Sequence, residues 1–187
     1  MIITLLAVFL LAKLKHYKIR YLFCTWSFYP IFILQCILIF LQGAIFTGNY
    51  YFIQYASVIE TLIILSFVFP LLAYQLYKPA FIGTGLVLLG SLLNRLVIGQ
   101  NNGKMPVFPT LSYLTGYVHA DTMNSIDNIH IIGSEASRLK FLADYIDVGY
   151  SILSPGDLLI HSFTFIMLYC TIRSVHLKYA VRISEKW

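Results

Sequence analysis

Four long apolar runs constrain this sequence more than any other feature. Each is close to the length of about 20 residues that an α-helix needs to cross a bilayer. Charged residues make up only 11% of the chain, whereas a soluble domain usually has about 25% and needs them to cover its surface. The sequence therefore predicts an all-α, polytopic transmembrane helix bundle, with residues 1–187 forming a single integral membrane domain. The four runs are residues 26–46, 51–74, 79–98 and 157–172.

A fifth and shorter apolar run covers about residues 2–14 at the N-terminus. Lys13 can extend its reach, because a lysine stem lies in lipid while its ammonium group stays in water. In a cleaved signal peptide the positive charges precede the apolar region, but here Lys13, Lys15, Lys18 and Arg20 follow it. We therefore expect a retained helix and about five spans in total.

The connections between the runs alternate in charge. The outer segment, residues 100–156, has five acidic residues against three basic ones, and the connection after residue 46 has no charge. Lysine and arginine collect on the cytoplasmic side of a membrane protein. The alternation therefore predicts a plasma membrane protein with its N-terminus outside and its C-terminus in the cytoplasm. The basic residues assigned to the cytoplasmic side are Lys13, Lys15, Lys18, Arg20, Lys78, Arg173, Lys178, Arg182 and Lys186.

The outer segment carries two local patterns. Residues 101–103, Asn-Asn-Gly, form a turn signal, and prolines at positions 106 and 109 exclude a helix there. Apolar residues at helical spacing predict a short amphipathic helix over residues 134–146. Such a helix is expected to lie in the outer interface with its apolar face toward the bundle. Its apolar residues are Leu139, Leu142, Ala143 and Ile146.

Two ionisable residues fall inside predicted spans. Glu60 lies about ten residues into the third span, a depth at which an ionisable group is costly and often functional. It is interpreted either as a neutral carboxyl that hydrogen-bonds between helices or as part of a transport pathway. Arg95 lies near the outer end of the fourth span. Its expected partners are the carboxylates of Asp144, Asp147 or Asp157.

The residues Ser154, Pro155 and Asp157 predict how the last span begins. Serine as N-cap, proline in the first helical position and aspartate three residues after the serine make a capping box. A second interpretation pairs Asp157 with His161, one turn later, as an acid–base pair or half of a metal site. The histidines that would complete such a metal site are His119 and His130.

Three stretches on the predicted outer face resemble the motifs of the lipoprotein signal peptidases. That family consists of four-helix aspartyl membrane proteases, so the resemblance implies that the second to fifth spans correspond to its four helices. The matching stretches are residues 90–96 with Gly99, residues 144–147 and residues 154–157.

The resemblance places Asp157 at the second catalytic aspartate of that family, but Asn94 at the first. An aspartyl protease needs two carboxylates that share one proton. Activity would therefore require Asp144 or Asp147 to act in place of Asn94. If the predicted amphipathic helix continued as far as Asp147, these two aspartates would share one face of it, and otherwise they are solvated residues at the end of that helix.

Three further motifs lie between residues 90 and 160. They are Asn-x-Gly-x-Met-Pro at residues 101–106, Leu-x-Asp-x-Ile at residues 142–146 and Ser-x-Gly-Asp at residues 154–157. This pattern more closely resembles a family of small, uncharacterised bacterial multi-pass membrane proteins. The resemblance implies a membrane protein and brings no activity with it.

The leading hypothesis is a non-catalytic membrane module with a polar site at its outer face. The backbone N–H groups of a glycine turn and a guanidinium suit an anionic group. Its partners besides the bilayer would be a lipid headgroup, a small anionic ligand or another membrane protein. The residues expected to form the site are Asn94, Arg95, Asn101, Gly103, Met105 and Asp157.

The alternative hypothesis is a divergent membrane hydrolase of the aspartyl type, whose candidate catalytic residues are Asp144, Asp147 and Asp157. A transporter that uses Glu60 is a third possibility. No cofactor, metal or nucleic acid is expected. The cysteines share no metal-ligand spacing and are interpreted as small apolar residues; they are Cys24, Cys36 and Cys170.

Overall fold

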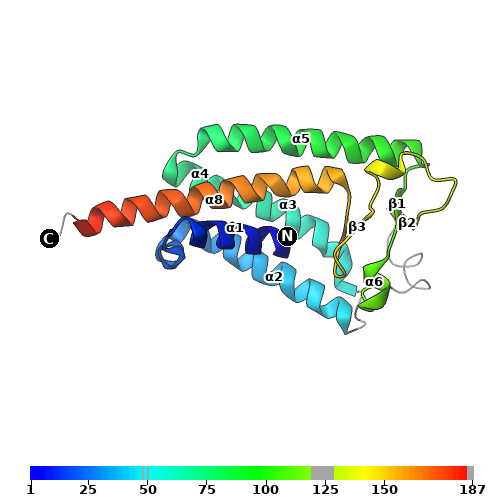
Figure 1. The fold of residues 1–187 in the computed structure, drawn as a ribbon, viewed down its shortest axis with the longest axis horizontal. Coiled ribbons are helices and arrows are strands. Elements are labelled where there is room, and N and C mark those ends of the chain that lie inside the picture. Colours follow the sequence, from blue (N-terminus) through cyan, green and yellow to red (C-terminus); the bar gives the residue numbers. More distant parts are fainter. Residues whose placement is uncertain (48, 50, 119–128, 185–187) are drawn as a thin grey trace. The chain divides into compact units, whose positions relative to one another are not determined.

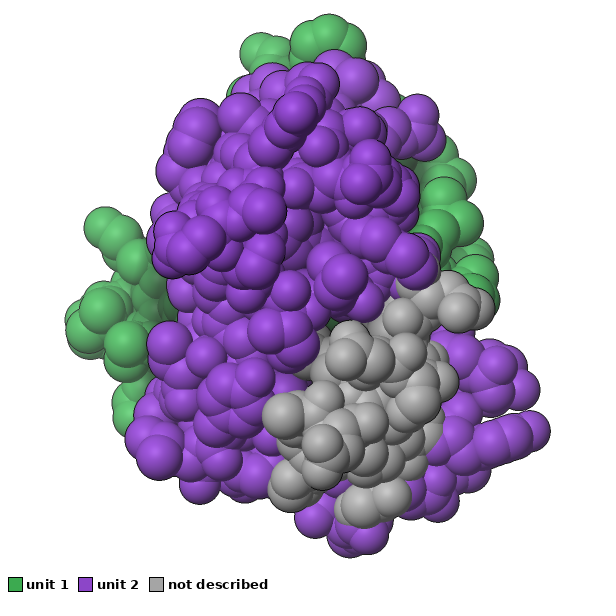
Figure 2. Space-filling model, turned by 90° about the vertical axis from the view of Figure 1, so that its right-hand side faces the viewer, with its two compact units in different colours: residues 1–39, 57–85, 161–187 green, residues 40–56, 86–160 purple. Residues whose placement is uncertain are grey.

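The computed structural model describes residues 1–47, 49, 51–118 and 129–184, and its chain divides into two compact units (Figures 1 and 2). Each unit is built from segments that are distant in the sequence, because several helices pass from one unit into the other. Unit 1 consists of residues 1–39, 57–85 and 161–187, and unit 2 of residues 40–56 and 86–160.

Four helical stretches are long and apolar enough to cross a membrane, judged by length and composition within the described residues. They coincide with the four long apolar runs, so the prediction of four long helices there is confirmed. The stretches are Trp26–Phe46, Ala56–Tyr74, Tyr77–Gln100 and Pro155–Ala180. The first contains a 3-10 turn, Trp26–Phe28, followed by α2, Tyr29–Phe46.

Helix α1, Ile2–Leu14, corresponds to the short N-terminal run. Its 13 residues are about 20 Å long at 1.5 Å per residue, which is less than the hydrocarbon thickness of about 30 Å. Val8 and Ala12 of this helix are nevertheless fully buried within unit 1. The helix is therefore part of the packed core of that unit.

The apolar run over residues 51–74 was predicted as one span, but it is not one continuous helix. It begins with a 3-10 helix, Tyr51–Tyr55, and continues as α3, Ala56–Ser66, and α4, Val68–Tyr74. The break at Phe67 is explained by Pro70, which has no N–H to donate and whose ring clashes with the carbonyl four residues earlier. Hydropathy alone did not reveal this break, because proline interrupts the helix without interrupting the apolar run.

Helices α5 and α8 extend beyond the apolar runs over residues 79–98 and 157–172. Helix α5 is Tyr77–Gln100, and α8 is Pro155–Ser184 with 30 residues. Val175, one turn beyond residue 172, is still buried, so packing continues beyond the apolar stretch.

Unit 1 is held together by apolar and aromatic contacts. The rings of Phe67 and Phe163 meet edge to face with 5.6 Å between their centroids. Gly83 on α5 lies so close to Phe163 that a Cβ there would be 2.7 Å from its ring. Glycine at this position therefore lets α5 and α8 approach each other within unit 1.

Most of the outer segment belongs to unit 2 and contains short strands. Strand β1, Met105–Val107, pairs in parallel with β2, His130–Ile132, and β3, Ile146–Asp147, pairs in antiparallel fashion with β4, Ile152–Leu153. A one-turn helix, α6, Leu111–Leu114, lies between β1 and β2 in the sequence. A small core formed by Val97, Met105 and Ala143 joins this segment to α5.

The amphipathic helix expected over residues 134–146 is absent from the structure, so that prediction was wrong. Leu139 has a φ of 54°, which a right-handed helix does not allow, and only a 3-10 turn follows, Lys140–Leu142. The backbone of Asp144 pairs with the segment next to β1, donating to Pro106 O at 3.1 Å and accepting from Phe108 N at 2.8 Å. Leu139 and Leu142 still pack on the core as their pattern suggested.

Candidate functional site

The first group of the predicted polar residues lies where α5 and α8 approach each other within unit 2. A Cβ on Gly156 would lie 2.7 Å from Gly90 O and would also overlap the side-chain oxygen of Asn94. The two glycines thus allow the backbones of the two helices to come into contact. This close approach brings Asn94 next to Ser154 and Asp157. We call these three residues the helix junction.

The helix junction is a closed set of hydrogen bonds. Asn94 donates from Nδ2 to Asp157 Oδ1 at 2.8 Å and accepts at Oδ1 from the Ser154 hydroxyl, also at 2.8 Å. Asp157 N–H donates to Ser154 Oγ at 2.9 Å, and Ser154 N–H donates to Asp157 Oδ2 at 3.0 Å. The capping box predicted for Ser154 and Asp157 is therefore confirmed. Asn94 extends it across to α5.

A second group of contacts fixes the end of α5. The side chain of Asn101 accepts from Arg138 N–H at 2.8 Å and donates to Arg138 O at 3.0 Å and to Val97 O at 2.8 Å. Gly103, with a φ of 78°, donates its N–H to Ile98 O at 3.0 Å. Asn101 and Gly103 therefore end the helix, and Asn101 also holds the backbone of Arg138 beside it.

Asp147 organises a turn near α6. Its carboxylate accepts from Thr110 N–H at 2.7 Å, from Gly149 N–H at 2.8 Å, and from both the N–H and the hydroxyl of Ser112, at 2.8 and 2.5 Å. Burial alone raises the pKa of Asp147, but these hydrogen bonds outweigh it and leave the pKa below its ordinary value. The carboxylate is thus held ionised as a structural acceptor.

Asp144 is buried in the same outer segment. Its Oδ2 lies 3.5 Å from Nε2 of His130 on β2, and its backbone pairs with the residues that flank β1. The predicted shared helical face of Asp144 and Asp147 does not exist, because neither residue is in a helix. In the contacts described above, the three aspartates belong to three different hydrogen-bonding groups.

The other predicted site residues differ in accessibility. Met105 is buried in the small core of unit 2, whereas Arg95 is exposed on α5. The ion pair predicted between Arg95 and one of the three aspartates is not found among the described residues, where Asp144 lies near His130 and Lys140 pairs with Glu135. Glu60 is half-buried on α3 in unit 1.

A metal site has no support among the residues that the structure describes, where no three His, Cys, Asp or Glu side chains gather. His130 faces Asp144, and His119 lies outside the described residues. Ser112 and Thr110 are partners of Asp147 that the sequence did not predict. No local pattern indicates them, because Asp147 follows Ser112 by 35 positions.

The fold and its polar groups define a helical protein with four stretches suited to crossing a membrane and a folded polar segment after α5. The chain belongs to a family of unknown function, DUF5317, whose model matches residues 3–169. The match covers the helix junction, the short strands and the first three apolar stretches in full, and the fourth up to residue 169. No curated protein and no solved structure matches the chain.

Proposed function

We propose that the protein is a non-catalytic, multi-pass protein of the cell membrane whose outer face binds an anionic group. In this proposal α1 and the four apolar stretches make five spans, the N-terminus is outside and the C-terminus is in the cytoplasm. The distribution of lysine and arginine supports that orientation. Residues 100–156 then lie outside, together with the helix junction at the outer end of α5.

The observation that carries the non-catalytic assignment is the use of the candidate carboxylates. Asp157 accepts hydrogen bonds from Asn94 and Ser154, and Asp147 accepts five from Thr110, Ser112 and Gly149. An aspartyl hydrolase needs two carboxylates next to each other around one proton. Here the neighbour of Asp157 is an amide, which cannot take a proton from water. This arrangement weighs against the hydrolase hypothesis.

The anionic ligand is inferred from the position of Arg95. This residue is exposed on α5 in line with Leu88, Leu92 and Leu96, which are exposed as well. Their spacing places them on one face of the helix, and an exposed leucine face on a membrane helix suits lipid. An arginine at the outer end of such a face extends its guanidinium toward the headgroups. Its five donors match a phosphate or carboxylate group.

The proposal is tested by counting the anionic lipids that the purified protein retains. Native mass spectrometry with phosphatidylglycerol is expected to show one retained lipid fewer for Arg95→Gln than for the unaltered chain. Arg138→Gln removes the same charge from another exposed position of unit 2 and should leave the number of retained lipids unchanged. The anionic group could belong to a lipid or to a small soluble molecule. Addition of glycerol 3-phosphate distinguishes these sources, because it displaces the lipid only if the phosphate headgroup is sufficient for binding. Equal retention by both variants would contradict the proposal.

A further inference from the structure

The two units differ strongly in charge. Unit 1 contains nine of the 13 basic residues, but only Glu60 and Glu185 of the eight acidic ones. Unit 2 has six acidic residues and four basic ones. Unit 1 therefore has a large excess of positive charge. Its basic residues are Lys13, Lys15, Lys18, Arg20, Lys78, Arg173, Lys178, Arg182 and Lys186.

Part of this charge is gathered on a stack of aromatic rings in unit 1. The rings of Tyr21 and Tyr179 are stacked with 5.3 Å between centroids and 19° between planes. Arg20 Cζ and Lys18 Nζ lie 5.3 and 5.9 Å from the centroid of the Tyr21 ring. The ring of His176 lies 6.3 Å from that of Tyr21. We call these five residues the basic aromatic cluster.

The cluster is fixed by hydrogen bonds between distant segments. The backbone N–H of Lys18 donates to Nδ1 of His176 at 3.2 Å, and the Tyr179 hydroxyl donates to the carbonyl of Cys24 at 2.9 Å. Because Nδ1 accepts, the neutral ring of His176 has its proton on Nε2. The cluster thus combines two cations with a further N–H donor on a rigid base, and such a set of donors suits an anion.

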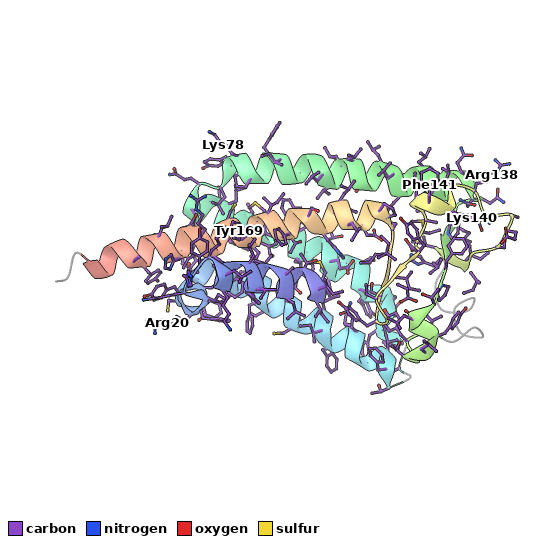
Figure 3. The ribbon with its side chains drawn as sticks, viewed as in Figure 1. Arg20, Lys78, Arg138, Lys140, Phe141 and Tyr169 are labelled. Atoms are coloured by element: carbon purple, nitrogen blue, oxygen red, sulfur yellow. The ribbon has the colours of Figure 1, made fainter. Side chains whose placement is uncertain are left out.

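Within the described residues, neither Lys18 nor Arg20 forms a salt bridge with a carboxylate. Lys18 and Arg20 are both exposed, and Figure 3 shows Arg20 extending outward from unit 1. Arg20 is the largest cause of a lowered pKa at Tyr21, and the charge of Lys18 lowers it further. The local field is therefore positive, and a bound anion would reduce the repulsion between the two cations.

Exposed apolar side chains lie close to the cluster in the sequence. Leu14 and Trp26 are each 66% exposed, and Phe23 and Leu177 are also exposed. Leu14 and Trp26 flank the loop that carries Lys18 and Arg20, and Leu177 follows His176 on α8. A free phosphate would make no use of such surfaces. A phospholipid would cover them with its acyl chains while its headgroup meets the cations.

We propose that the basic aromatic cluster binds the headgroup of an anionic phospholipid, with the phosphate accepting hydrogen bonds from Lys18 and Arg20. This site is distinct from the anionic site proposed around Arg95, which belongs to unit 2. It requires only that the helices of unit 1 lie in a bilayer, and it holds for either orientation of the chain.

Trp26 provides a local reporter for the test. In a Trp187→Phe background it is the only tryptophan, because the chain has two. Reconstituted protein is titrated with phosphatidylglycerol or phosphatidylcholine whose acyl chains carry bromine, which quenches nearby tryptophan. We expect the apparent affinity for the anionic lipid to exceed that for the zwitterionic one by roughly tenfold or more, given two cations at the headgroup. Equal quenching by the two lipids would overturn the proposal, and this outcome can be measured with the cluster residues unaltered.

Matched variants identify the residues. Lys18→Gln with Arg20→Gln should bring the ratio of the two affinities close to one. Arg138→Gln with Lys140→Gln removes the same charge from unit 2 and should leave the ratio unchanged. If both double variants lowered the ratio of the two affinities equally, the preference for the anionic lipid would come from diffuse charge attraction, and the proposed site would be contradicted. Displacement of the brominated lipid by soluble glycerol 3-phosphate would show a phosphate site that does not recognise lipid, and this too would overturn the proposal.

Discussion

The side-chain amide of Asn94 donates a hydrogen bond to the carboxylate of Asp157, with 2.8 Å between Nδ2 and Oδ1, although the two residues are 63 positions apart. An ionised carboxylate can only accept hydrogen bonds, whereas an amide both donates and accepts. Asn94 uses both abilities, because it also accepts from the Ser154 hydroxyl. The contact between α5 and α8 in unit 2 therefore depends on having an amide on one helix and a carboxylate on the other.

The first prediction exchanges this amide for a second acid. Asn94→Asp should destabilise the protein by about 1–3 kcal/mol at pH 8, because the new carboxylate has no proton to donate and Asp157 loses its partner. A protonated carboxyl can donate again, so the loss should shrink as the pH falls toward 5. Thermal unfolding of the detergent-solubilised protein over this pH range measures the effect.

Asn94→Ala is the control for that experiment. It removes both side-chain hydrogen bonds of Asn94 without adding a charge, so its destabilisation should change much less between pH 8 and pH 5. If the alanine and aspartate variants showed the same dependence on pH, protonation of the new carboxylate would not be the cause.

A second prediction concerns the close approach of the backbones. A Cβ on Gly156 would lie 2.7 Å from Gly90 O, so Gly156→Ala should force the helices apart and lower stability by about 1–3 kcal/mol. Gly99 is also within α5, but a Cβ there would meet no atom within 4 Å. Gly99→Ala should therefore be neutral or stabilise by up to about 1 kcal/mol. Similar melting temperatures for the two variants would argue against a tight crossing at Gly156.

The helix junction also shows how much of the structure could be predicted from the sequence. The four long helices follow from apolar runs of sufficient length, and the capping box of Ser154 and Asp157 follows from residues three positions apart. The hydrogen bond from Asn94 to Asp157 could not be predicted in this way, because the two residues are 63 positions apart and no local spacing links them.

The structure of the outer segment was harder to predict than the long helices, and the reason is physical. Leu139, Leu142 and Ala143 have the spacing of a helix face, and all three are buried or packed on the core. The backbone groups beside β1 offer Asp144 hydrogen bonds with Pro106 and Phe108, and this pairing replaces the helix. Strands of two or three residues leave too short an alternation to be recognised, and their partners are distant in the sequence.

A third prediction uses the turn around Asp147. Its lowered pKa means that the ionised carboxylate stabilises the fold, and that this contribution is fully present above the ordinary value of 3.8. The contribution is lost as the pH falls through the lower pKa of the folded state. Asp147→Asn presents N–H groups to backbone donors, so it should cost about 1–3 kcal/mol at pH 7, and the difference from the unaltered chain should narrow near pH 3.

Melting temperatures at pH 7 and at pH 3 test this prediction, with Glu135→Gln as the control. Glu135 is fully exposed and its carboxylate lies 3.0 Å from Nζ of Lys140, and an exposed ion pair contributes little to stability. A destabilisation by Asp147→Asn that did not exceed that of Glu135→Gln at pH 7 would show that the turn does not depend on the carboxylate.

The last prediction tests the orientation on which the outer-face proposal rests. In a background where Cys24, Cys36 and Cys170 are replaced by alanine, a single cysteine is introduced as Glu135→Cys or as Lys15→Cys, both of which are exposed positions. The excess of lysine and arginine around Lys15 predicts that this residue lies on the cytoplasmic side. A membrane-impermeant maleimide added to intact cells should therefore label Glu135→Cys at once and Lys15→Cys only after the membrane is permeabilised. The reverse pattern would move the helix junction and Arg95 to the cytoplasmic side, and a ligand of the outer leaflet would no longer be able to reach them.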